Sequence, residues 1–135
     1  DIPKYLYKNK RYVFFEFSDG TPRGSSGSPV VANRSIATDN SIYPQGGLAF
    51  ISSIKPILEP STKTLTWEPF SRFVINQDTG NAIKGLGRVD LYFGIGRKAG
   101  QLAGRFMQKG NLYFLLIKDK PIEFSKNSKT TTLVR

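Results

Sequence analysis

Two aspartates in this chain could do acid–base chemistry, because each lies beside an apolar, β-favouring run. Asp78 follows the run 73–75, and Asp90 lies inside the run 89–93, with a loop containing three glycines between them. Such a loop can turn tightly or bring its backbone close to a ligand, so two distant carboxylates could meet. Two acids whose environments push their pKa values apart are a usual way to build acid–base chemistry at neutral pH.

Each aspartate also has a structural interpretation. Asp78 could cap a turn, since aspartate side chains often bond to the backbone of the turn that they start. Asp90 is harder to explain in this way, because burying a carboxylate in an apolar strand is costly unless the group is used or paired. A third aspartate, Asp39, lies in the turn-rich segment 38–47, where we expect it to organise its own turn.

Composition removes several classes of enzyme. The 135 residues include no His and no Cys, which excludes serine–histidine and cysteine–histidine triads and the common zinc sites. Any titrating group must therefore be Asp, Glu, Tyr or Lys, and we expect no metal and no cofactor. The net charge of +10 indicates an anionic partner, for which nucleic acid, a membrane surface and an acidic polysaccharide all qualify.

The element pattern predicts one mainly β domain, a barrel with closed edges rather than a doubly wound parallel sheet. Apolar residues recur with helical spacing only at 97–108, where Lys109 and Gly110 should end the helix. The small-residue segment 23–29 is expected to be a loop at the rim of the barrel, and residues 55–66 a hairpin or excursion. Strands are expected at residues 12–17, 30–32, 35–37, 48–51, 70–75 and 111–118.

The glycine-rich loop shares features with two known motifs. Residues 80–85 have the outer glycine spacing of a phosphate-binding loop, but Leu86 and Gly87 stand where lysine and serine or threonine are required. The run 78–80 also resembles the signature of retroviral-type aspartic proteases. The Gly-Arg pair at 96–97 follows too soon to leave room for the flap of such a protease.

Taken together, four segments resemble the three-aspartate domain of the membrane-bound lytic transglycosylase A family. These segments are 35–39, 44–46, 78–85 and 88–94, and the likeness continues through 94–105, 112–116 and 11–16. It covers about residues 11–117 in the right order. Asn81 departs from the pattern, since the family usually has a second glycine there.

The resemblance implies a double-psi β-barrel, which with the helical pattern gives a barrel domain with one short helix at residues 1–124. Residues 125–135 are rich in Lys, Ser and Thr, which predicts a mobile basic tail. The resemblance implies a peptidoglycan lytic transglycosylase, a carbon–oxygen lyase that cleaves the β-1,4 bond between N-acetylmuramic acid and N-acetylglucosamine without water. The product would carry a 1,6-anhydro end. Because family members are two to three times longer, it also implies that this chain is part of a larger two-domain protein.

Partners and location follow from the same resemblance. We expect peptidoglycan glycan strands and the missing second domain as partners, and no nucleic acid. Any membrane contact would be made through an anchor absent from this chain. The expected location is the bacterial cell envelope, in the periplasm and associated with the outer membrane.

Residue roles are carried over position by position. Asp90 would be the acid/base, with a pKa raised by its apolar neighbours Val89 and Leu91. Asp78 would orient or polarise the site, and Asp39 would hold a neighbouring loop. The expected substrate-binding residues are Asp39, Gly80, Lys84, Gly85 and Tyr92. The alternative function is a non-catalytic barrel that binds polysaccharide or a partner.

Overall fold

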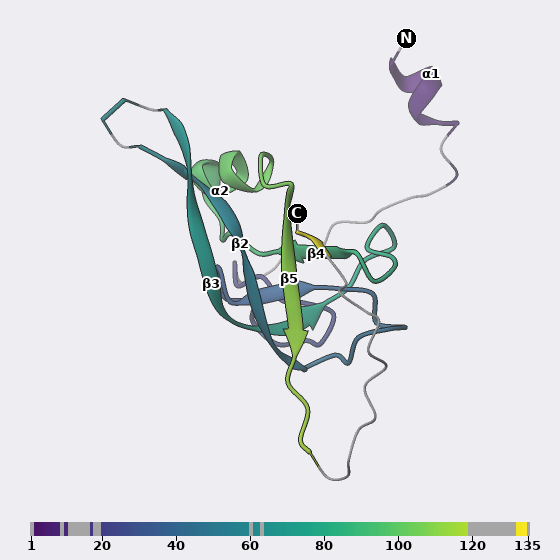
Figure 1. Cartoon of the computed structure of the whole chain (residues 1–135). Coiled ribbons are helices and arrows are strands. Elements are labelled where there is room, and N and C mark those ends of the chain that lie inside the picture. The colour runs from purple at the N-terminus through teal and green to yellow at the C-terminus, as the bar shows by residue number, and fades with distance from the viewer. Residues whose placement is uncertain are drawn as a thin grey trace.

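A computed structural model describes residues 2–8, 10, 17, 20–59, 61–62, 64–118 and 132–134. Within these residues the protein is mainly β, as the sequence predicts (Figure 1). The strands are β1 (Ser35–Ala37), β2 (Leu48–Leu58), β3 (Leu65–Asp78), β4 (Arg88–Leu91), β5 (Gln108–Phe114) and β6 (Thr132–Val134). The helices are α1 (Ile2–Leu6) and α2 (Gly96–Ala103).

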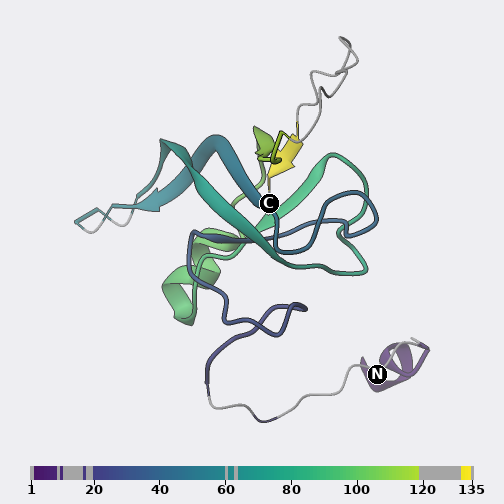
Figure 2. The same cartoon turned by 90° about the horizontal axis from the view of Figure 1, so that it is seen from below.

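The strands are hydrogen-bonded in the order β1-β3-β2-β5-β6-β4, and pairing of β4 with β1 closes the ring. The first five strands form one curled sheet, and β6 fills the space between β5 and β4. Figure 2 shows this curled sheet after a quarter turn, with β6 beside β5. The prediction of closed edges is confirmed.

The hairpin of β2 and β3 is the largest element of the sheet. Its strands pair in antiparallel register from Leu48 opposite Ile75 to Leu58 opposite Leu65, and the Glu59 N–H donates to the carbonyl of Thr64 at its end. Both strands extend past the predicted ranges 48–51 and 70–75, so residues 55–66 form the predicted hairpin. The part of the hairpin that pairs with neither β1 nor β5 projects from the barrel (Figure 1).

Alternation along the strands places one apolar face inside the barrel. The buried core consists of Ile36, Ala49, Ile51, Phe70, Val74, Val89, Leu91 and Phe106. Phe93, Leu112 and Phe114 pack against this core, and the rings of Phe93 and Phe106 meet edge to face at 5.1 Å between centroids.

The helix α2 ends earlier than the sequence predicts. It stops at Ala103, and the Phe106 N–H then donates to the Ala103 carbonyl in a tighter turn that carries Phe106 into the core. Lys109 and Gly110 therefore lie in β5 rather than at a helix end. The apolar spacing that predicts a helix to 108 includes Phe106, which is buried by this turn and not by a helical face.

Three other expectations differ from the structure. Residues 30–32 form no strand, because the N–H groups of Arg34 and Ser35 both donate to the Val31 carbonyl and turn the chain. The last predicted strand, 111–118, is shifted, since β5 spans Gln108–Phe114. Within the predicted tail 125–135, Thr132–Val134 form β6.

Most of the predicted strand 12–17 lies outside the described residues. The short helix α1 was not predicted. Within the described part of the chain, no helix has the length and apolar character needed to cross a membrane.

Candidate active site

Asp78 and Asp90 lie on either side of one small residue, Ala37. In the parallel pair of β1 and β3, Ala37 is opposite Asp78, and in the antiparallel pair of β1 and β4 it is opposite Asp90. Adjacent strands lie about 4.8 Å apart, so this register separates the two aspartate Cα atoms by about 10 Å. The sequence prediction that the two acids come together is confirmed.

A β-bulge in β3 is what turns Asp78 toward Asp90. Ile36 pairs with Asn76 but Ala37 pairs with Asp78, so Gln77 is one extra residue in β3. In an unbroken ladder Ala37 would face Gln77, and the Asp78 side chain would point to the opposite face of the sheet. The bulge therefore places both carboxylates on one face.

That face carries a cavity of about 330 Å³. Its walls are Pro22, Arg23, Val30, Ser35, Ile36, Ala37, Asp78, Ile83, Asp90, Leu91 and Tyr92. A larger open hollow of about 880 Å³ lies between β2 and β5, but no carboxylate lines it. The smaller cavity combines two acids, one guanidinium and one phenol, so it is the candidate active site.

Asp90 is held by a cation from its own strand. The Arg88 guanidinium donates to both of its carboxylate oxygens, at 2.7 Å from Nε and 3.0 Å from Nη2. This bidentate contact raises the pKa of Arg88. Arg88 and Asp90 share a face because they are two residues apart in a strand.

The apolar surroundings of Asp90 differ from those predicted. Val89 and Leu91 are buried in the core on the other face of β4, whereas the Asp90 side chain is 34% exposed. Alternate residues of a strand point to opposite faces, so the two side chains do not enclose the carboxylate. Apolar residues that line the same cavity as Asp90 include Val30, Ala37 and Ile83. A guanidinium pair is instead what stabilises this carboxylate.

The loop of residues 22–30 packs against the end of β3 and carries part of the cavity wall. The Ser25 N–H donates to Asp78 Oδ1 at 2.9 Å, and the Ser26 N–H donates to the Gln77 carbonyl at 3.2 Å. A Cβ at Gly24 would collide with the Gln77 carbonyl oxygen, so only glycine lets this backbone approach so closely. The predicted rim loop is confirmed, and it fixes the Asp78 carboxylate.

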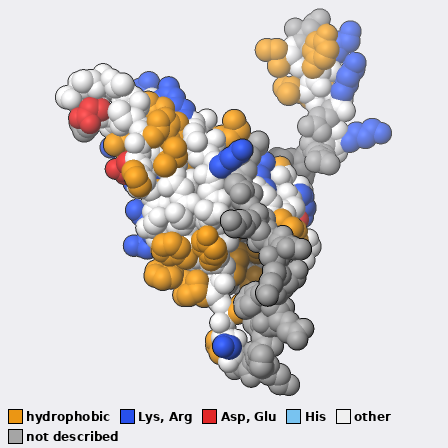
Figure 3. Space-filling view, in the orientation of Figure 1, with side chains coloured by type: hydrophobic (Ala, Val, Ile, Leu, Met, Phe, Trp, Pro, Cys, Tyr) orange, Lys and Arg blue, Asp and Glu red, His pale blue; other side chains and the backbone are white. Residues whose placement is uncertain are grey.

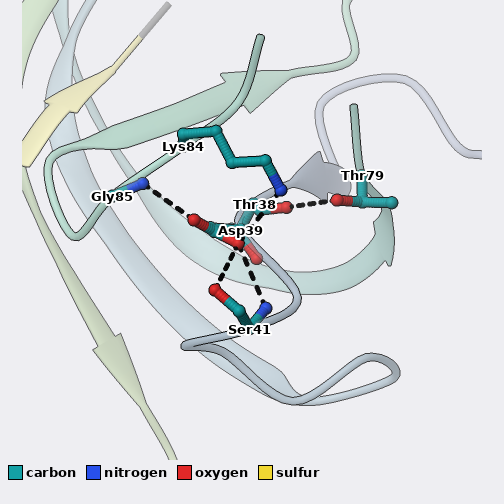
Figure 4. A network of polar contacts seen from close by, with 6 residues as sticks. All are labelled: Thr38, Asp39, Ser41, Thr79, Lys84 and Gly85. Atoms are coloured by element: carbon teal, nitrogen blue, oxygen red, sulfur yellow. Dashed lines mark hydrogen bonds and ion pairs between the residues drawn. The ribbon is translucent and has the colours of Figure 1, made fainter. Parts of the chain in front are cut away.

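Asp39 lies outside the cavity wall and joins two loops (Figure 4). Its Oδ1 accepts from the backbone N–H and hydroxyl of Ser41, and its Oδ2 accepts from the Gly85 N–H at 2.9 Å. Lys84 Nζ lies 3.5 Å from Oδ1. Both structural expectations for Asp39 are confirmed, since it organises its own turn and holds the glycine-rich loop.

These contacts set the charge state of Asp39. The hydrogen bonds from Gly85 and Ser41 hold the pKa of the Asp39 carboxyl far below its ordinary value. A lowered folded-state pKa adds stability that is present above about pH 4 and is lost as the pH falls toward the folded pKa.

Replacing Asp39 with Asn should therefore lower the midpoint of urea unfolding at pH 7, because an amide nitrogen would face hydrogen-bond donors. The difference in unfolding midpoint between variant and parent should become smaller between pH 4 and pH 2, because the parent loses the stabilisation that the ionised carboxylate provides. Unfolding curves at pH 7, 4 and 2 measure this. A gap that stayed constant with pH would show that the ionised carboxylate is not what holds the loops.

The remaining predicted binding residues lie partly at the cavity and partly in the hydrogen-bond network of Asp39. Tyr92 lines the cavity, and Gly80 contributes indirectly, because its carbonyl accepts from Ile83, whose side chain is part of the wall. Lys84 and Gly85 belong to the Asp39 network, away from the cavity wall.

Among the cavity residues that were not predicted as part of the site are Arg23, Ser35 and Ala37. No signal in the sequence marks Arg23, which reaches the cavity only because its loop folds back on a strand far along the chain. The contact of Arg88 with Asp90 could have been predicted, since a cation and an acid two positions apart in a strand share a face.

Fold and site together define a mainly β barrel with an acid-lined cavity at the end of three neighbouring strands. Residues 34–116 match the family model described as the 3D domain. The chain therefore belongs to the 3D-domain family, in the form found in membrane-bound lytic transglycosylase A.

Curated relatives share this likeness over most of the present chain. The membrane-bound lytic murein transglycosylase A of Vibrio cholerae is 34% identical over 125 residues, which is 90% of this chain and 32% of that protein. The Escherichia coli K12 protein of the same name is 33% identical, over 85% of this chain and 31% of its own length. The chain thus spans about a third of the length of the curated relatives it matches.

Solved structures of lytic transglycosylases are similar to this chain in fold as well as in sequence. MltA from Neisseria gonorrhoeae superposes with a TM-score of 0.67 at 33% identity, covering 87% of this chain and 28% of that one. The lytic transglycosylase LtgG of Burkholderia pseudomallei gives a TM-score of 0.61 at 37% identity, over 84% and 32% of the two chains. A structure of Escherichia coli MltA that contains bound chitohexaose gives 0.64 at 32% identity, over 84% and 33%.

Proposed function

We propose that this domain is the acid–base part of a peptidoglycan lytic transglycosylase. It would cleave the β-1,4 bond between N-acetylmuramic acid and N-acetylglucosamine and leave a 1,6-anhydro end. The observation that carries the proposal is the register that places Asp78 and Asp90 beside Ala37 on one cavity. The names of the relatives supply the reaction class.

In the proposed reaction Asp90 protonates the glycosidic oxygen as the bond to the anomeric carbon breaks. Its carboxylate then takes the proton of the 6-hydroxyl of the same N-acetylmuramic acid, whose oxygen bonds to that carbon. Intramolecular attack is favoured by proximity, so one acid that alternates between donor and acceptor is sufficient. Asp78 supports the site electrostatically from across Ala37.

The contact with Arg88 adds a requirement to this mechanism. Both Asp90 oxygens accept hydrogen bonds from the Arg88 guanidinium, whereas a general acid must present a proton to the glycosidic oxygen. The bound glycan must therefore weaken this contact before Asp90 can act as the acid. A sugar hydroxyl that displaces one guanidinium nitrogen would do so.

The proposal also covers the topology of the barrel and the location of the protein in the cell. We infer the double-psi arrangement of the barrel from the family likeness, which the parallel pairs β1 with β3 and β4 with β6 support. The names of the relatives favour the bacterial cell envelope, and within it we propose the periplasm at the outer membrane. The remainder of a longer relative would supply a second wall for the substrate.

A second candidate is a barrel that binds glycan without cleaving it. The bidentate pair of Arg88 with Asp90 favours it, because both acid oxygens are occupied in this state.

Digestion of purified cell wall in heavy-oxygen water separates these functions. A lytic transglycosylase should release fragments with anhydro ends and no solvent oxygen, because the 6-hydroxyl supplies the new bond. A label at the new sugar end would mean hydrolysis and would contradict the proposal. Glycan binding without release would favour the second candidate.

Replacing Asp78 with Asn tests its supporting role. Asn keeps an oxygen to accept the Ser25 N–H, so the loop should hold while the negative charge is lost. We expect release of anhydro fragments to fall by about a hundredfold at most, less than for the acid/base itself. Initial rates on purified cell wall measure this. Equal losses at Asp78 and Asp90 would show that the two acids work as a coupled pair.

A further inference from the structure

Arg23 is a cation on the cavity wall whose donors are mostly unused. It lines the same cavity as Asp78 and Asp90, and its Nη1 donates to the Gly27 carbonyl at 3.0 Å. A guanidinium has five N–H donors in a planar fork that matches a carboxylate. Among the hydrogen bonds and ion pairs of residues 20–59 and 64–118, the Gly27 contact is the one that this side chain makes.

The two acids of the cavity already have other partners. Asp90 accepts from Arg88, and Asp78 accepts from the Ser25 N–H. Neither carboxylate forms an ion pair with Arg23 in the part of the chain that the structure describes. The guanidinium is thus positioned to receive an anion from outside the protein.

The loop that carries Arg23 is held in place before any ligand binds. Arg23 and Pro29 form a β-bridge, the Gly24 N–H donates to the Ser28 carbonyl at 3.1 Å, and the Val30 N–H donates to the Pro22 carbonyl at 3.0 Å. Contacts of Ser25 and Ser26 with the end of β3 fix the loop to the sheet. A preorganised donor loses less entropy when its ligand binds.

Surface charge favours an acidic ligand as well. The chain carries 20 Lys and Arg against 10 Asp and Glu, and Figure 3 shows basic side chains at more places than acidic ones on the visible face. A positive field steers a polyanion to the surface, but specificity needs a fixed donor at the site. Arg23 is that donor.

We propose that Arg23 forms a carboxylate subsite of the cavity and selects acidic glycans over neutral ones. In peptidoglycan the carboxylate would be that of the lactyl ether on N-acetylmuramic acid, free in strands without stem peptides. This inference rests on the proposed function, since it names the substrate class of the same cavity. It assigns to Arg23 recognition of the acidic sugar beside the glycosidic oxygen that Asp90 protonates.

Binding of two glycans to the purified full chain tests the proposal. The acidic probe is a cell-wall glycan strand stripped of stem peptides, and the neutral probe is chitohexaose. We expect Arg23→Gln to raise the Kd for the acidic strand about tenfold, in line with the loss of a charge-assisted hydrogen bond. The Kd for chitohexaose should stay the same. Arg23→Lys, which keeps the charge but loses the fork, should fall between parent and Arg23→Gln for the acidic strand.

Arg34→Gln is the matched control. Arg34 is also an exposed arginine, and its Nη1 donates to a backbone carbonyl, that of Phe73, at 3.0 Å, but it does not line the cavity. The control removes the same charge elsewhere, so its affinity for both glycans should match the parent. A drop equal to that of Arg23→Gln would mean that net charge alone attracts the strand, which would overturn the subsite.

Other outcomes separate the subsite from the proposed function. If the parent cleaves cell wall and Arg23→Gln binds the acidic strand as well as the parent does, the subsite is wrong and the function stands. An equal rise in Kd for the acidic strand and for chitohexaose would assign Arg23 a structural role and would also overturn the subsite. A parent that binds neither glycan and releases nothing would contradict the proposed function together with its subsite.

Discussion

Asp90→Asn should reduce the release of anhydro fragments by about a thousandfold while leaving glycan binding and the fold unchanged. The amide is nearly isosteric with the carboxylic acid, but it cannot give a proton to the glycosidic oxygen or take one from the 6-hydroxyl. Positioned proton transfer typically contributes factors of about 10² to 10⁴ in rate, so its loss should dominate. The amide oxygen can still accept from Arg88, which keeps the strand geometry.

Rates from purified cell wall, with fragments identified by mass, measure this change. Glu68→Gln is a suitable control, because Glu68 is also a carboxylate in an ion pair, at 2.9 Å from Lys55 Nζ, and lies outside the cavity wall. Its activity should equal that of the parent. If Asp90→Asn kept more than a few per cent of the parent rate, another group would have to be the acid/base.

The sequence was most informative where chemistry and periodicity agree. Strand, glycine-rich loop and strand were correctly predicted between residues 73 and 93, and the acids at both ends of this loop do line one cavity. The closed barrel followed from many short apolar runs with one clear helix. Asp39 was correctly expected to support loops, because aspartate in a turn usually bonds to nearby backbone.

Other features depend on contacts between segments that are distant in the chain. The bulge at Gln77 decides which way Asp78 points, yet no residue type in that strand signals it. The loop of residues 22–30 reaches the cavity by hydrogen bonds to residues about fifty positions later, which local patterns cannot predict. Helix length was overestimated because Phe106 continues the helical spacing while a turn buries it.

The environment of Asp90 illustrates a more specific error. Its apolar sequence neighbours suggested desolvation, whereas the strand points them into the core and turns Asp90 toward Arg88. Neighbours at positions two apart, not one apart, determine the surroundings of a side chain in a strand. Applied to residues 88 and 90, this rule predicts the ion pair.

Ala37→Leu tests the cavity itself, independently of proton transfer. Ala37 is the residue between the two acids, and it lines the cavity in which we propose that the sugar binds. A leucine side chain would occupy this space, so we expect release of anhydro fragments to fall by more than about a hundredfold through displacement of the bound sugar. Glycan affinity should fall as well, which distinguishes this variant from Asp90→Asn.

Because Ala37 is 8% exposed, the larger side chain could also cost stability, and overpacking typically costs about 1–3 kcal/mol. Thermal melts of each variant therefore accompany the assays, which are run well below the melting temperature. Ala37→Ser is the matched control at the same position, since it adds one atom and should keep most of the parent activity. If folded Ala37→Leu cleaved cell wall as fast as Ala37→Ser, the reaction would take place elsewhere, and the register of Asp78 and Asp90 about Ala37 would be a feature of the barrel alone.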